Sequence, residues 1–188
     1  MIKKNIIAAA FMLAGLTLAA SASAQVYVGA AIGQAKWDIS CAGLTTCKTS
    51  DTSYKFIGGY DFTRIFGVEA SYFSLGELNF SNNVLKAETR AKGFEFSGVV
   101  RTPQFVGISG FGKLGVAAVK GETNSSGTIA VESSKTKAQV VYGVGMTYTF
   151  TEKTSLRAEF ERRKVDVANV ANATANVNTF SIGIQASY

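Results

Sequence analysis

Apolar and polar residues alternate along most of the chain after residue 25. In residues 138–150 the even positions carry Ala, Val, Tyr, Val, Met, Tyr and Phe, while Gln, Gly and Thr dominate the odd positions. Successive side chains of a β-strand point to opposite faces, so this pattern predicts strands with one apolar face. No segment after residue 25 is typical of a helix of useful length. Eight strands are predicted, near residues 26–35, 54–62, 66–78, 93–102, 108–120, 138–150, 155–165 and 178–188.

Charged residues within these strands fall on the face opposite the apolar one, with Arg162 as the exception. The ten that follow the rule are Lys55, Asp61, Glu69, Glu95, Arg101, Lys113, Arg157, Glu159, Glu161 and Arg163. The solvent face of a soluble β-sandwich would show the same placement. However, this face is also rich in Gly and Ser, and its five acids balance its five bases. That combination favours the crowded interior of a narrow barrel, where an unpaired buried charge costs several kcal/mol. We therefore predict a charge network inside a barrel whose apolar face meets lipid.

The connections between the predicted strands alternate in length. Long polar stretches cover residues 37–52, 81–92, 121–135 and 166–177, whereas short ones cover 63–65, 103–107 and 151–154. This alternation is typical of an up-and-down barrel with both termini in the periplasm and long extracellular loops. The predicted fold is an all-β, eight-stranded antiparallel transmembrane β-barrel of a Gram-negative outer membrane.

The first 24 residues are typical of a secretory signal peptide. Lys3 and Lys4 precede an apolar run over residues 6–20, and Ala22-Ser-Ala24 supplies a cleavage pattern. The alternative, an anchoring helix, needs about 20 apolar residues. We predict a cleaved signal peptide over residues 1–24 and a barrel over 25–188. The formal net charge of +6 includes the two lysines of this leader.

Composition narrows the possible chemistry. The chain has no histidine, which excludes histidine-dependent hydrolases and histidine-ligated metal sites. Residues 110–115 match G-x-G-x-x-G, but they continue into a strand instead of opening a helix that could bind phosphate. We therefore expect no catalytic residues, no cofactor, no metal and no enzymatic activity. Nucleic-acid binding is also not expected, because the aromatic residues lie on the predicted lipid face.

Cys41 and Cys47 both lie in the first long connection. In an exported protein they predict a disulfide that constrains this loop. Free thiols or an intermolecular bridge remain the alternatives.

Several segments carry a family resemblance. Residues 54–62 (YKFIGGYDF) followed by 66–76 (FGVEASYFSLG) resemble the second hairpin of the OmpA-like transmembrane domain family. Residues 26–33 (VYVGAAIG) and 156–160 (LRAEF) are similar to its first and seventh strands.

The resemblance implies roles for individual residues. Glu69 and Arg157 would belong to an interior ion-pair network, with Glu159 beside them and Lys113 as a further interior base. Three positions depart from the family, because Ala31, Val99 and Thr147 stand where charged residues are usual, so a pore or gate of relatives is not carried over. Larger members of the family carry a C-terminal peptidoglycan-binding domain, which we do not expect here, so cell-wall anchoring is not inferred.

The final strand, with Phe180 and the terminal Tyr188, resembles the assembly signal of outer-membrane barrels, which implies the barrel assembly machinery as a partner. Other aromatic residues gather where strands meet the short connections and predict an interfacial girdle. The girdle residues are Tyr60, Phe62, Phe66, Phe105, Tyr148, Phe150 and Tyr188.

Basic residues near the loop bases could contact lipopolysaccharide phosphates or serve only as solubilising charge. They are Lys36, Lys86, Lys92, Lys120, Lys135, Lys137, Arg162 and Lys164. The leading functional hypothesis is a monomeric outer-membrane scaffold for envelope integrity and surface loop display. The alternatives are a narrow ion channel gated by interior charges and an adhesin whose loops bind a host surface or another extracellular ligand.

Overall fold

The computed structural model describes residues 25–38, 46–81, 86–126, 131–166 and 174–188. At several ends of these stretches it describes the backbone only. The predicted signal peptide over residues 1–24 lies outside the described residues.

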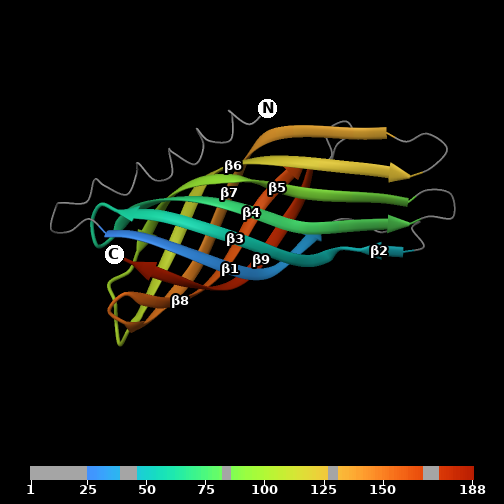
Figure 1. Ribbon diagram of the computed structural model, residues 1–188. Helices are drawn as coiled ribbons and strands as arrows, with labels where there is room; N and C mark the ends of the chain where they lie inside the picture. The colour runs from blue at the N-terminus through green and yellow to red at the C-terminus, as the bar shows by residue number, and fades with distance from the viewer. Residues whose placement is uncertain (1–24, 39–45, 82–85, 127–130, 167–173) are drawn as a thin grey trace, which may run out of the picture.

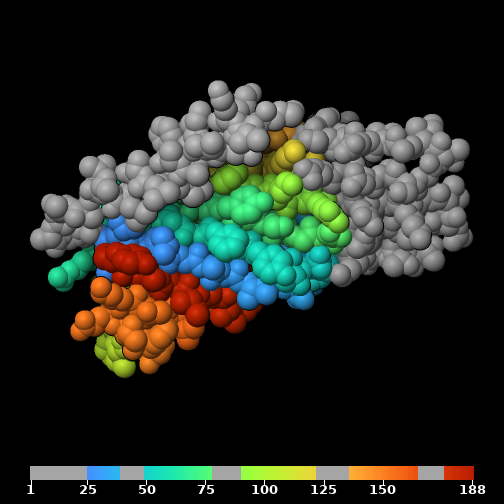
Figure 2. Space-filling view, in the orientation of Figure 1, coloured from blue at the N-terminus to red at the C-terminus, as the bar shows by residue number. Residues whose placement is uncertain are grey.

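Eight long antiparallel strands close into a barrel, which confirms the predicted fold class (Figure 1). Each long strand pairs with its neighbours in sequence, and β1 also pairs with β9 to close the wall. In Figure 2 the blue surface of β1 lies between the cyan surface of β3 and the red surface of β9. No described segment forms a helix long and apolar enough to cross a membrane. The strands are β1 (Gln25–Asp38), β2 (Thr46–Lys48), β3 (Ser50–Asp61), β4 (Phe66–Ser81), β5 (Lys86–Arg101), β6 (Ile108–Ser126), β7 (Val131–Thr151), β8 (Thr154–Asp166) and β9 (Thr174–Ser187).

The strands extend further than predicted at the end opposite the termini. The predicted loops 81–92 and 121–135 are largely strand, and the β6–β7 ladder continues to the pair Ser125–Val131. The paired residues 86–92 and 121–126 include no large apolar residue, so they lack the one-sided apolar pattern that marks a strand in the sequence. Strand β2, which was not predicted, lies within the predicted first loop and pairs with the end of β4. Figure 1 shows the hairpins of β4–β5 and β6–β7 projecting beyond the rest of the barrel.

The apolar series of every long strand points outward. Ile32, Phe56, Phe94, Leu114 and Ile184 are each more than half exposed. A soluble β-sandwich would bury this series between its sheets, so that alternative is wrong. So large an apolar surface is expected of a wall in contact with lipid. The girdle residues lie outward at the end that carries the short turns, and all except the intermediate Tyr60 are exposed.

The turn between β5 and β6 has an unfavourable residue. Phe105 and Ile108 exchange two backbone hydrogen bonds of 2.8 and 2.9 Å around Val106 and Gly107. Both central residues have positive φ, 49° and 79°, which defines a type I′ hairpin turn. A β-branched residue such as Val106 is strained in this conformation, whereas Asn and Gly adopt it readily.

We predict that Val106→Asn raises the free energy of unfolding by about 1 kcal/mol, because the left-handed conformation costs a β-branched residue about that much. Urea titration of the refolded barrel measures the change. Gly107→Ala at the neighbouring position of positive φ is the matched control and should lower the free energy. A lower free energy for Val106→Asn would contradict the strain at this turn.

Candidate functional site inside the barrel

Glycines in the wall let side chains on either side meet across an intervening strand. Tyr27 of β1 and Glu69 of β4 both lie directly opposite Gly59 of β3. A Cβ atom at Gly59 would overlap the Tyr27 ring, so only glycine allows the ring to cross it. The Tyr27 hydroxyl then donates a hydrogen bond of 3.1 Å to Glu69 Oε2.

The same arrangement recurs on β7. Gly143 lies directly opposite both Lys113 of β6 and Glu161 of β8. A side chain at this position would meet Lys113 and Glu161 atoms at 3.1–3.3 Å. The glycine therefore lets the lysine reach across β7 to the carboxylate.

Lys113 is the centre of the interior charges. Its Nζ lies 2.6 Å from Glu95 Oε1, 2.7 Å from Glu159 Oε1 and 3.5 Å from Glu69 Oε1, and it also contacts Glu161. The side chains of Lys113, Glu69 and Glu95 are fully inaccessible to solvent. One lysine thus joins carboxylates from three strands, β4, β5 and β8.

Three further bases complete the network. Arg157 forms a two-pronged ion pair with Glu69, at 2.7 and 3.2 Å, and also donates to Glu159 and to Gln185. Lys55 contacts Glu161 at 2.6 Å and Glu159 at 3.2 Å. Arg163 contacts Glu95 at 3.0 Å and Glu161 at 2.9 Å. The eight residues joined in this way are Lys55, Glu69, Glu95, Lys113, Arg157, Glu159, Glu161 and Arg163.

Arg101 and Asp61 form a separate pair, at 3.1 Å, nearer the short turns. The Arg101 guanidinium lies 4.9 Å from the centre of the Tyr27 ring and 5.7 Å from that of Phe111. Tyr27 therefore links this pair to the larger network through its hydrogen bond to Glu69. All ten charges assigned to the interior from the sequence lie in this arrangement.

Aromatic residues inside the barrel were not predicted as part of the site. Arg157 stacks on Phe111 with 4.3 Å from the guanidinium carbon to the ring centre, and Arg163 stacks on Phe73 at 4.2 Å. Such contacts stabilise a cation by about 0.5–2 kcal/mol. The signal in the sequence was their position in the alternation, since Phe73 and Phe111 share the series of Glu69 and Lys113 on their strands, and Tyr27 lies opposite the apolar series of β1.

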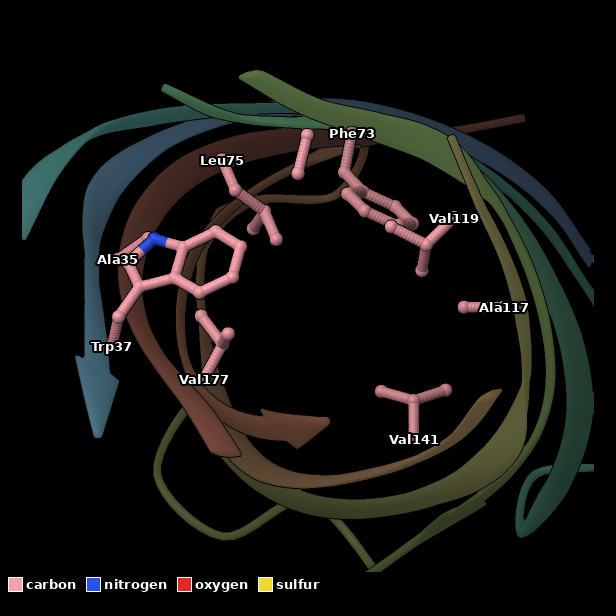
Figure 3. Close-up of a cluster of buried hydrophobic side chains, with 9 residues drawn as sticks. Ala35, Trp37, Phe73, Leu75, Ala117, Val119, Val141 and Val177 are labelled. Atoms are coloured by element: carbon pink, nitrogen blue, oxygen red, sulfur yellow. The ribbon is translucent and has the colours of Figure 1, made fainter. Parts of the chain in front are cut away.

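An apolar layer covers the network on the side away from the termini. Phe73 and Leu75 follow Glu69 along the inner face of β4, and Trp37 occupies the corresponding end of β1 (Figure 3). Trp37 had been placed in a loop by the sequence pattern, but it belongs to β1 and is buried. The layer consists of Ala35, Trp37, Phe73, Leu75, Ala91, Ala117, Val119, Val141 and Val177.

The three departures from the OmpA-like pattern have a structural context. Ala31 lies directly opposite Lys55, so β3 supplies a lysine beside the position where β1 lacks one. Val99 lies opposite Lys113, and Thr147 lies opposite Arg157. At all three positions the side chain without charge therefore stands beside a base of the network.

The remaining predicted site residues lie outside this network. Phe180 and Tyr188 are exposed on the outer face, and the Tyr188 amide donates to Val26 O at 2.9 Å. Their role in assembly stays a prediction. The disulfide does too, because Cys41 and the side chain of Cys47 lie outside what the structure describes. Within the described residues, no group of Cys, Asp and Glu is arranged to hold a metal ion.

We predict that Gly59→Ala lowers the free energy of unfolding by roughly 1–3 kcal/mol, because the added methyl group displaces the Tyr27 ring. The neighbouring Gly58→Ala is the control, since a methyl group there meets no atom within 4 Å. Urea titration followed by the fraction of compact, fast-migrating protein on a gel measures both. Equal effects of the two variants would show that the ring does not need this glycine.

Lys113→Met should lower the free energy of unfolding by roughly 3–5 kcal/mol, because it leaves buried carboxylates without their shared base. The double variant Lys113→Met/Glu161→Met should recover part of this loss, because it removes a carboxylate together with the base. Lys120→Met, an exposed position on the outer face of the same strand, is the control and should change little in neutral detergent. A Lys113→Met barrel as stable as wild type would refute the central role of this lysine.

Comparison with known proteins agrees with this architecture. The model of the outer membrane protein beta-barrel domain family matches residues 6–188. Ail, the attachment invasion locus protein of Yersinia pestis, solved with the heparin analogue sucrose octasulfate, is 15% identical with a TM-score of 0.59, over 88% of this chain and 99% of that one. Neisserial surface protein A is 14% identical with a TM-score of 0.64, over 87% and 97% of the two chains.

The N-terminal β-barrel domain of Pseudomonas aeruginosa OprF is 13% identical with a TM-score of 0.55, again over 87% and 97%. At these identities the likeness concerns the fold. A search of curated proteins found no match. The resemblance to small OmpA-like barrels is thereby confirmed, and the chain belongs to the outer membrane protein beta-barrel domain family, which places it in the outer membrane.

Proposed function

We propose that this protein is a non-enzymatic scaffold of the outer membrane that supports envelope integrity and displays its long hairpins at the cell surface. In this orientation both termini lie in the periplasm. The observation that carries the proposal is the occupied lumen, in which a balanced network of ion pairs lies beneath a buried apolar layer.

The occupied lumen argues against the channel alternative. A passing ion would have to displace side chains that are paired with one another and then pass the buried apolar side chains of the layer. The interior carboxylates are engaged with Lys or Arg, and the chain contains no histidine. Neither feature suits acid–base or nucleophilic chemistry, so the proposal assigns no reaction.

The projecting hairpins support a second candidate, an adhesin. The strands β6 and β7 have 19 and 21 residues, against 14 for β1, so the wall extends well past the apolar band on one side. Paired strands hold a polar surface at a fixed distance from the membrane without need of an apolar core.

Cells that lack the protein should release a periplasmic enzyme and take up a hydrophobic dye, and the wild-type chain should reverse both effects. A shortened variant, in which Asn-Gly replaces residues 123–133, should reverse both effects equally, because the lumen and the part of the wall within the apolar band are unchanged. Attachment to host cells that is lost only in the shortened variant would favour the adhesin.

The purified barrel in a planar bilayer serves as the counter-test. No stable conductance is expected from the wild-type protein. Conductance steps that disappear in Lys113→Glu would contradict the closed scaffold and favour a gated channel.

A further inference from the structure

The inner face of β1 leaves a small cavity beside the charge network. From residue 29 to residue 35 this face carries only Gly and Ala, whose side chains are too short to fill the space in front of them. Ala31 borders a cavity of about 10 Å³, and Phe73 and Leu75 of the apolar layer also line it (Figure 3). The polar residues of the inner face that line it are Ser53, Lys55, Glu161, Arg163, Thr179 and Ser181.

Three polar atoms of these lining residues have no hydrogen-bond partner within the described part of the chain. They are Arg163 Nε, Thr179 Oγ1 and Ser181 Oγ. The three residues are 1%, 4% and 3% exposed, so bulk water does not reach them. Most buried polar groups of native proteins have a partner. Three such groups without one, in residues around a single cavity, indicate a ligand there.

The strands on either side of β9 offer the two hydroxyls no partner. On β8, the carboxylates directly opposite Thr179 and Ser181 are both held by Lys55. On β1, the residues opposite the two hydroxyls are Ala35 and Gly33, which have no polar side chain. A partner for these hydroxyls therefore has to come from the cavity itself.

The size and the charge of the cavity select the ligand. Its volume of about 10 Å³ matches the roughly 10–15 Å³ that one water molecule needs. The network beside it joins four acidic and four basic residues, so a bound ion would add an uncompensated charge to a buried site. A water molecule is neutral, accepts a hydrogen bond from an N–H group and donates to two oxygen atoms. It matches the three atoms in number and in kind.

We propose that this cavity is a binding site for one water molecule, held by Arg163 Nε, Thr179 Oγ1 and Ser181 Oγ. The water joins the charge network of β8 to β9, a strand without any charged residue. Because β9 also pairs with β1 to close the wall, the water stabilises the seam between the first and the last strand. The site concerns closure of the barrel, so it holds whether or not the protein serves as an envelope scaffold.

A crystal structure of the purified barrel tests the ligand directly. We expect density for a single atom within hydrogen-bond distance of Arg163 Nε, Thr179 Oγ1 and Ser181 Oγ, and no anomalous signal at that point in crystals soaked in bromide. An empty cavity would overturn the site. Bromide in the cavity would overturn the choice of water and favour an anion.

Removal of the two hydroxyls tests what the water contributes to stability. Thr179→Val/Ser181→Ala leaves the water with a single partner, so the equilibrium constant of unfolding in urea should rise roughly fivefold or more. In a dry cavity the same change would remove two unpaired buried hydroxyls, and the barrel would be at least as stable as wild type. That second outcome would refute the proposal, because the direction of the effect depends on the water.

Ser71→Ala/Ser97→Ala is the matched control. These two hydroxyls are also buried and without a partner in the described part of the chain, but they do not line the cavity. The control should not raise the equilibrium constant of unfolding. An equal rise in both double variants would mean that the loss comes from buried hydroxyls in general, and it would overturn the site.

Amide hydrogen exchange locates the effect within the wall. In Thr179→Val/Ser181→Ala the amides of the β1–β9 ladder should exchange faster than in wild type, while those of the β5–β6 ladder should change little. The same acceleration in both ladders would contradict a role of the water at the seam.

Discussion

The barrel wall is a single layer of β-strands, with lipid on its outer face and packed side chains on its inner face. This arrangement determines where each charged residue can lie. A charge within the apolar band cannot face lipid, and a charge in the lumen must find a partner there. Lys113 meets this condition with carboxylates from β4, β5 and β8. Because these contacts span the lumen, they also fix the register of distant strands. A slip of one residue in any of them would turn its charges toward lipid.

The glycines of the wall leave the space that this network needs. Gly59 and Gly143 each lie between two interacting side chains from the flanking strands. Glycine on the middle strand leaves room for a long side chain to pass over that strand. Side chains of the two flanking strands, which are not adjacent to each other, can then form an ion pair. The lumen of a narrow barrel can therefore be filled by a few long side chains, provided that short ones alternate with them.

The sequence predicted the parts of the fold that depend on one-sided burial. The alternation of inward and outward positions along each strand was enough to assign all ten interior charges to the lumen. It was enough because a charge that faces lipid in the apolar band is so costly. Strand ends beyond the membrane carried no such signal. Residues 86–92 and 121–126 pair through their backbones but contain no large apolar residue, so they were predicted as loops. The stacking of Phe111 on Arg157 could not be predicted either, since it depends on which interior positions of β6 and β8 share a level.

The ion pairs of the lumen are sheltered from the solvent on both sides. The interior pairs are shielded by Trp37, Leu75 and their neighbours at one end, and by Arg101 with the Tyr27 and Phe111 rings at the other. Ions in the medium screen such buried pairs weakly, whereas they screen exposed charges over about 8–10 Å. Salt should therefore leave the lumen network nearly unchanged. Ion pairs enclosed in this way can hold distant strands together while the ionic surroundings of the barrel change.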